Sequence, residues 1–209
     1  MKRIIGSVVL ALCAVFAMGQ TPAEILGKME MALEQRKGEG VAMAVDAKAP
    51  IVGTLRSRTW TLGEKYRMEA TMMGVTLITW IDETTQWDLN TKKNELTIKT
   101  LNPNLNKKSE GDGDLSDLSG LSKGYDLMIT AETDTQWQIQ GKRSKDNDDK
   151  DSPKSVEIVV AKGTYLPITF TAKASGVRMT LRDITFGVTE SQVTFNPADY
   201  PDATIVDKR

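Results

Sequence analysis

The sequence contains no histidine, and its only cysteine is Cys13. Without histidine there is no ordinary Ser-His-Asp triad, and without a cysteine beyond the first 20 residues there is no thiol nucleophile in the body of the chain. The zinc sites that Cys and His build are excluded for the same reason. We therefore expect a protein that is not an enzyme and that has no cofactor and no metal site.

Acidic residues are the remaining candidates for chemistry. Asp112, Asp114 and Ser116 have the spacing of a calcium loop, but Asp117 replaces the required glycine and Lys123 stands where the loop needs a bidentate glutamate. A glycosidase-type pair of carboxylates meets only in space, so that possibility stays open at the level of sequence. No sequence pattern points to catalysis.

The charges nearly cancel, with 27 Lys and Arg against 28 Asp and Glu spread along 209 residues. This scattered balance argues against an electrostatic grip on nucleic acid or on acidic membrane, because both require clustered positive charge. The length suits one domain with a sizeable core.

The N-terminal residues have the pattern of a secretory signal. Two basic residues open the chain, an apolar run occupies residues 4–16, and small residues follow. We expect residues 1–19 to be a signal peptide and residues 20–209 to form a single soluble domain; no other segment approaches the ~20 apolar residues of a spanning helix. A lipid anchor on Cys13 is the alternative, which is disfavoured because Leu12 before it is not small.

A helix is predicted directly after this segment. Thr21-Pro22-Ala23-Glu24 is a capping box with proline at the first helical position. The apolar residues that follow share one helical face, so the helix should be amphipathic and lie on an apolar surface. They are Ile25, Leu26, Met29 and Leu33.

From Val41 onward the apolar period changes to two, which is typical of half-buried strands. About ten or eleven short strands fit the chain, the last of them around Val193 and Phe195. Clean alternation in consecutive strands favours an antiparallel meander with one wet face. Such a sheet must bury its other face against itself or against a helix.

Two stretches interrupt the alternation. Residues 102–124 are rich in Gly, Ser, Asp and Asn, and Leu115, Leu118 and Leu121 are spaced by three, which predicts a short helical segment. Residues 142–154 carry mixed charge without an apolar side chain and should form an exposed hairpin loop.

Large aromatic residues and methionines recur on the predicted strands. Core packing is the ordinary explanation for each of them, but methionine also suits surfaces that adapt to varied apolar ligands. A curved sheet with such an inner face could enclose a cavity for lipid chains.

Several short motifs follow one another in a characteristic order. They are Gly53-Thr54-Leu55, Lys65-Tyr66-Arg67-Met68, Trp80-Ile81-Asp82-Glu83-Thr84-Thr85-Gln86-Trp87, Arg178-Met179-Thr180-Leu181, Val193-Thr194-Phe195-Asn196 and the C-terminal run 200–209. In order and spacing the chain resembles the outer-membrane lipoprotein carrier family, LolA. It departs from the better-known members at Leu62-Gly63, where they carry an Arg-Pro latch for the lid, and at Asp82-Glu83, where they have Asp-Gly.

The resemblance implies an unclosed antiparallel β half-barrel whose concave apolar face is covered by the N-terminal helix and a short helical lid segment. Its apolar cavity would bind lipid chains. The residues that we expect to line it are Ile25, Leu26, Met29, Leu33, Trp60, Tyr66, Met68, Met72, Trp80, Trp87, Leu89, Leu96, Ile98, Leu115, Leu118, Leu121, Trp137, Ile139, Phe170, Met179 and Leu181.

The function that the resemblance implies is that of a periplasmic carrier, which binds the acyl chains of lipoproteins and moves them toward the outer membrane. Its partners would be acylated lipoproteins, an inner-membrane release complex and an outer-membrane acceptor, and the protein would be a monomer. The alternatives are a non-catalytic envelope binding or sensor module on the same half-barrel, or a carrier of another lipid.

Overall fold

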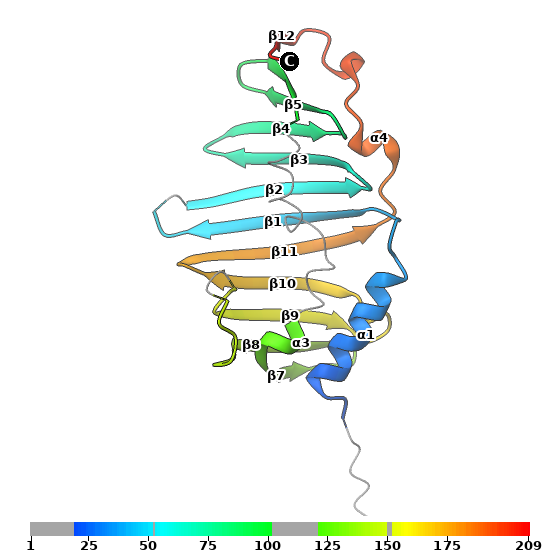
Figure 1. Cartoon of the computed structure of the whole chain (residues 1–209), viewed down its shortest axis with the longest axis vertical. Helices are drawn as coiled ribbons and strands as arrows, with labels where there is room; N and C mark the ends of the chain where they lie inside the picture. The colour runs from blue at the N-terminus through cyan, green and yellow to red at the C-terminus, as the bar shows by residue number, and fades with distance from the viewer. Residues whose placement is uncertain (1–18, 52, 102–120, 150–151) are drawn as a thin grey trace, which may run out of the picture.

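The fold is mainly β and consists of one large sheet (Figure 1). The computed structural model describes residues 19–51, 53–101, 121–149 and 152–209. Twelve strands pair in the order β12-β6-β5-β4-β3-β2-β1-β11-β10-β9-β8-β7. The strands are β1 (Val41–Ala49), β2 (Gly53–Leu62), β3 (Lys65–Met72), β4 (Val75–Ile81), β5 (Thr85–Asn90), β6 (Glu95–Thr100), β7 (Tyr125–Glu132), β8 (Gln136–Arg143), β9 (Ser155–Ala161), β10 (Pro167–Ala174), β11 (Val177–Phe186) and β12 (Thr204–Asp207).

The sheet is unclosed, as expected for a half-barrel, because its edge strands β12 and β7 do not pair with each other. Neighbouring strands are antiparallel at every pairing but one. The exception is β12, which runs parallel to β6 with Ile205 opposite Leu96. The expectation of an antiparallel sheet is therefore correct except at this last strand.

The predicted N-terminal helix is confirmed as α1 (Pro22–Glu34). The Thr21 side chain accepts a hydrogen bond from the Glu24 backbone N–H, and the Glu24 carboxylate accepts one from the Thr21 N–H at 2.8 Å. A single helical turn, α3 (Leu121–Gly124), precedes β7. Leu115 and Leu118 of the predicted lid segment lie outside the described residues.

The expected strand around Val193 and Phe195 is wrong. Residues Glu190–Val193 form the short helix α4, because Thr189 and Gln192 make a second capping box. A 3-10 turn, η2 (Pro197–Asp199), follows before the chain reaches β12. Val193 ends this helix and Phe195 follows it, and both side chains pack against the sheet.

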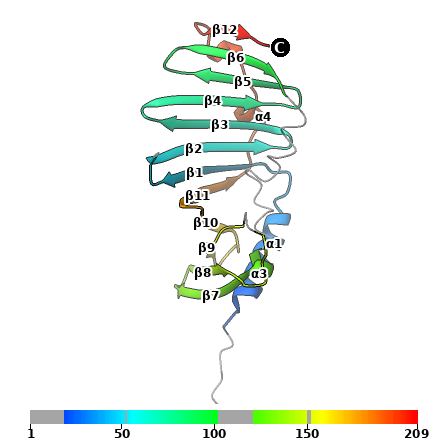
Figure 2. The same ribbon diagram turned by 60° about the vertical axis from the view of Figure 1, so that its left-hand side comes forward.

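The two faces of the sheet bury different cores. The α1 face is the face that carries Met43, Ile139, Ile158 and Phe170, which pack with α1 and α3. The opposite face carries Ala42, Trp60 and Trp80. They pack with residues 188–203, which include α4 and which we call the C-terminal segment. Figure 2 shows α1 and α3 at one end of the sheet and α4 near the middle strands.

Candidate functional site

The half of the α1 face beneath the helix is a closed core. Ile25 and Met29 of α1 are fully buried against Ile139 and Ile158 in the adjacent strands. The packing is dense, because a Cβ added to Gly141 would meet Val156 Cγ2 at 2.8 Å. This half therefore holds α1 on the sheet.

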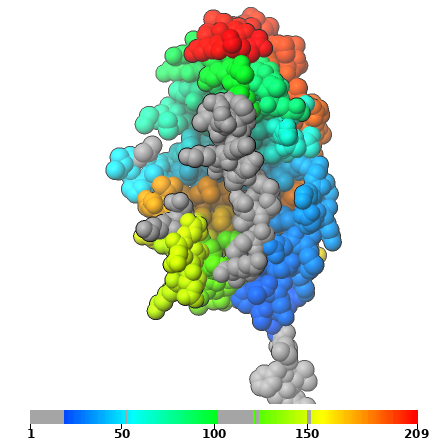
Figure 3. All heavy atoms as spheres, in the orientation of Figure 1, coloured from blue at the N-terminus to red at the C-terminus, as the bar shows by residue number. Residues whose placement is uncertain are grey.

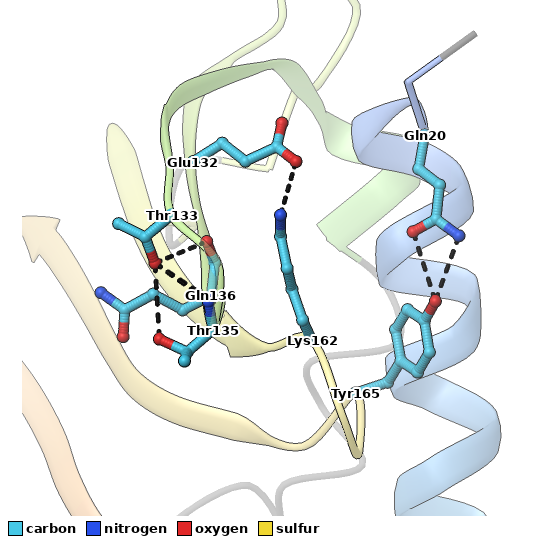
Figure 4. Close-up of polar contacts among 7 residues, drawn as sticks. All are labelled: Gln20, Glu132, Thr133, Thr135, Gln136, Lys162 and Tyr165. Carbon is cyan, nitrogen blue, oxygen red and sulfur yellow. Dashed lines mark hydrogen bonds and ion pairs between the residues drawn. The ribbon is translucent and has the colours of Figure 1, made fainter. Parts of the chain in front are cut away.

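Polar contacts fix α1 at the lower rim of this core (Figure 4). Gln20 Nε2 donates a hydrogen bond to the Tyr165 hydroxyl at 3.1 Å, and Lys28 Nζ donates another at 3.3 Å. These bonds, that of Gln20 first, lower the pKa of Tyr165. The Tyr165 ring stacks on Trp137 at 5.4 Å between centroids, and Lys162 Nζ lies 5.1 Å from the Trp137 ring.

The other half of the α1 face lies over β11, β1, β2, β3 and β4. It is an apolar surface that no helix of the described part of the chain covers. Cross-strand pairing builds it in rows, because Met179 pairs with Ala47, which pairs with Leu55. Four of its large side chains are 38–48% exposed: Leu55, Met72, Leu77 and Met179. We call this surface the open apolar lane, and its members are Val45, Ala47, Leu55, Met68, Ala70, Met72, Leu77, Met179 and Leu181.

The lane ends in polar residues toward β5 and β6. Asp88 accepts hydrogen bonds from Thr79 Oγ1 at 2.9 Å, from Gln86 Nε2 at 2.8 Å and from Lys99 Nζ at 2.7 Å. Burial works to raise the pKa of Asp88, but the bonds from Lys99, Gln86 and Thr79 outweigh it and hold the pKa below its ordinary value. Asp88 is thus an ionised carboxylate held by hydrogen bonds, and the apolar surface ends at it.

Six residues predicted for the cavity lie on the opposite face instead. They face the C-terminal segment, where Phe195 packs 5.3 Å from Trp80 and 5.5 Å from Trp87, and Tyr200 packs 5.4 Å from Trp80. The structure does not bring this group together with the residues of α1. The six residues are Trp60, Trp80, Trp87, Leu89, Leu96 and Ile98.

The remaining predicted residues within the described part of the chain lie on the α1 face. Those in or against the closed core are Ile25, Leu26, Met29, Leu33, Leu121, Trp137, Ile139, Phe170 and Leu181. Those over the open half are Tyr66, Met68, Met72 and Met179. Sequence reasoning missed Leu55 and Leu77, although both alternate in phase with Met68 and Met72 across paired strands.

Arg67 organises the opposite face. Its guanidinium lies 4.9 Å from the Trp60 ring and 5.6 Å from the Trp80 ring, on the two strands that flank it. It also pairs with Glu69 and donates a hydrogen bond to the Gln192 carbonyl at 3.5 Å. The arginine of the aromatic-Arg motif thus joins β3 to the C-terminal segment on the face away from α1.

A groove of about 310 Å³ also lies on the opposite face. Its lining is polar and charged, with Arg56, Arg58, Glu69, Arg182 and Asp183 among its residues. Arg182 already pairs with Asp46 at 3.1 Å and with Asp183. Such a lining is unsuited to acyl chains.

The described ranges offer neither a cluster of metal ligands nor a spanning helix. Within them no group of three or more Cys, Asp or Glu side chains could hold a metal ion. In the same ranges no helix combines the length and the apolar character needed to cross a membrane.

No protein-family model matches the chain, and no curated protein matches it. Among solved structures, an uncharacterized conserved protein from Thermus thermophilus is 19% identical, with a TM-score of 0.45 over 88% of this chain and 98% of that one. MucB of Pseudomonas aeruginosa, in complex with MucA, is 14% identical, with a TM-score of 0.45 over 83% of this chain and 60% of that one.

A LolA superfamily protein from Nitrosomonas europaea is 11% identical, with a TM-score of 0.31 over 86% of this chain and 100% of that one. A LolA superfamily protein, in keeping with the resemblance seen in the sequence, is thus among the solved structures to which this chain is similar. At these identities the likeness describes the fold and says nothing of activity.

Proposed function

We propose that this protein is a periplasmic carrier that holds the acyl chains of lipoproteins on the open apolar lane and moves them toward the outer membrane. The observation that carries the proposal is the lane itself. Leu55, Met72, Leu77 and Met179 are 38–48% exposed on one face of the sheet, and a contiguous exposed apolar patch is typical of a binding surface.

The chemistry of the lane suits reversible binding. Each methylene of an acyl chain left in water costs about 0.8 kcal/mol, so a carrier must cover the chains during transit. It must also release them, which favours a shallow surface of Met and Leu over a tight pocket. No covalent step is needed, and the lane contains no ionisable side chain.

The closed core supports the lane without being part of it. Leu181 and Val45 pack against the core under α1 and also belong to the lane, so the two halves of the α1 face are continuous. A displacement of α1 would lengthen the apolar surface along the sheet. Acylated lipoproteins, an inner-membrane release complex and an outer-membrane acceptor are the partners that this function requires.

Uptake of a triacylated peptide tests the proposal, with Leu77→Glu as the variant. Leu77 is 48% exposed in the lane, whereas Thr76 beside it on β4 points to the opposite face. We expect Leu77→Glu to weaken binding about tenfold or more, because a carboxylate must be desolvated beneath the chains. Thr76→Glu is the matched control and should bind as the wild type does.

Either of two results would refute the acyl-carrier function. One is a wild-type protein that takes up no triacylated peptide. The other is equal weakening by Leu77→Glu and Thr76→Glu, which would place the ligand elsewhere. Binding of unacylated envelope peptides alone would favour the non-catalytic sensor module.

A further inference from the structure

Four hairpins that are neighbours in the sheet turn at the same edge, on the left in Figure 1. They are the β5–β6, β3–β4, β1–β2 and β10–β11 hairpins. The β1–β2 turn protrudes at this edge in Figure 3, in cyan. Ile51 at its tip is 97% exposed, and Met73 at the tip of the β3–β4 hairpin is 89% exposed. Apolar side chains thus project from the edge with no covering residue around them in the described part of the chain.

The conformation of the β3–β4 turn makes Met73 unusual. Met73 has φ +52° and Gly74 has φ +76°, the left-handed pair of a tight hairpin in which Asn-Gly fits best. A methionine is disfavoured in that conformation, and here it gains no buried contact in return. Met73 thus has a backbone conformation that is unfavourable for its residue type, and no buried contact compensates for it. Such violations are expected at functional sites, which indicates a role in binding.

Positive charge gathers at the same edge. Residues 47–57, 70–77, 91–94 and 172–181, which make up the four hairpin ends, contain no Asp or Glu. The β8–β9 hairpin turns at the same edge beside β10, where the Lys154 N–H donates a hydrogen bond to the Lys173 carbonyl at 2.8 Å, and it carries acidic as well as basic residues. The excess of positive charge therefore belongs to the other four hairpins. Their cations are all exposed, and none forms an ion pair within the described part of the chain. These cations are Lys48, Arg56, Lys92, Lys93, Lys173 and Arg178.

The cations and the apolar side chains are arranged in register. Lys48 pairs with Arg178, which pairs with Lys173, so three of the cations form one row across β1, β11 and β10. Alternation puts this row on the opposite face, while Met179 and Ala47 beside it face the lane. The fold therefore brings together three positive charges that are separated in the sequence.

We propose that this edge, which we call the cationic hairpin edge, docks on the surface of an anionic phospholipid bilayer. Ile51 and Met73 would enter the boundary between headgroups and acyl chains, and the Lys and Arg side chains would contact lipid phosphates. An acidic protein would be held by the cations, but it gives no reason for apolar tips at the turns. The docking does not depend on the proposed carrier function, although Leu55 and Met72 of the lane begin at this edge.

Vesicle flotation tests the docking. The full chain is produced in cells, its mature mass is measured, and its binding is compared on phosphatidylethanolamine–phosphatidylglycerol (7:3) and on phosphatidylcholine vesicles. We expect binding to the anionic vesicles that weakens with salt. The pair Ile51→Ser and Met73→Asn, and the pair Lys48→Glu and Arg178→Glu, should each lower the partition coefficient about tenfold or more.

The variants separate docking from folding. Met73→Asn creates the favoured Asn-Gly turn, so it should keep or raise the unfolding midpoint while it removes the apolar tip. Met31→Ser and Lys37→Glu, on exposed positions of the N-terminal helix and just after it, are the matched controls and should bind as the wild type does. Equal binding of the wild type to both vesicle types would overturn the proposal. So would loss of binding in the charge pair without any loss in the apolar pair.

Discussion

Asp88 lies where the α1 face changes from apolar to polar residues. Its carboxylate accepts bonds from Thr79, Gln86 and Lys99 on three neighbouring strands, and these bonds hold its pKa below the ordinary value. A carboxylate with a lowered pKa adds stability that is fully present above the pKa of the unfolded chain. That stability is lost as the pH falls through about 4 toward the lower pKa of the folded state.

We therefore expect Asp88→Asn to lower the unfolding free energy by about 1 kcal/mol at pH 6, the usual size for a partly exposed charged network. The difference between wild type and variant should shrink below about pH 4, because the Asp88 carboxyl of the unfolded chain takes up a proton there while that of the folded protein stays ionised to lower pH. Urea denaturation at pH 6 and pH 3.5 measures both values. A difference that stays the same at both pH values would show that the charge of Asp88 does not stabilise the fold.

At the scale of elements, the C-terminal segment is the cover of the opposite face. Val193 is buried with Trp60, and Phe195 packs between Trp80 and Trp87. Lys65 of β3 pairs with Glu190 of α4, and this bond raises the pKa of Lys65 and lowers that of Glu190. The segment therefore stabilises the half of the sheet that α1 does not reach.

Phe195→Ala should cost about 2 kcal/mol of unfolding free energy, because it removes a half-buried ring that contacts the three aromatic rings of Trp80, Trp87 and Tyr200. It should also shift tryptophan emission to longer wavelength, since Trp80 and Trp87 lose their cover. Uptake of acylated peptide should remain, because these tryptophans face away from the lane. Loss of uptake in a folded Phe195→Ala protein would place the ligand on the opposite face.

Periodicity in the sequence predicted the elements better than it predicted their faces. The capping box at Thr21 and the alternation of Tyr66 and Met68 correspond to α1 and β3. Alternation states that Trp87 and Leu89 share a face, but not which face, because both sides of this sheet bury apolar residues. The decision rests on the contact with Phe195, which is more than 100 residues away in the sequence.

At the scale of the whole molecule, the sheet separates three surfaces that the sequence interleaves. One face holds α1 and the open apolar lane, the other holds the C-terminal cover, and the hairpin ends gather Lys48, Arg178 and their neighbours. Alternate residues of one strand therefore serve different surfaces, as Met179 and Arg178 do. A composition that is neutral overall conceals this division, because only strand pairing creates it.

The carrier function is tested most directly by native mass spectrometry of the protein recovered from the envelope of the cells that make it. The wild type should carry an additional mass that matches acylated protein or lipid, Thr76→Glu should carry it as well, and Leu77→Glu should lack it while remaining folded. A wild-type protein with only its own mass under gentle conditions, which also gains none when triacylated peptide is added, would contradict the carrier function.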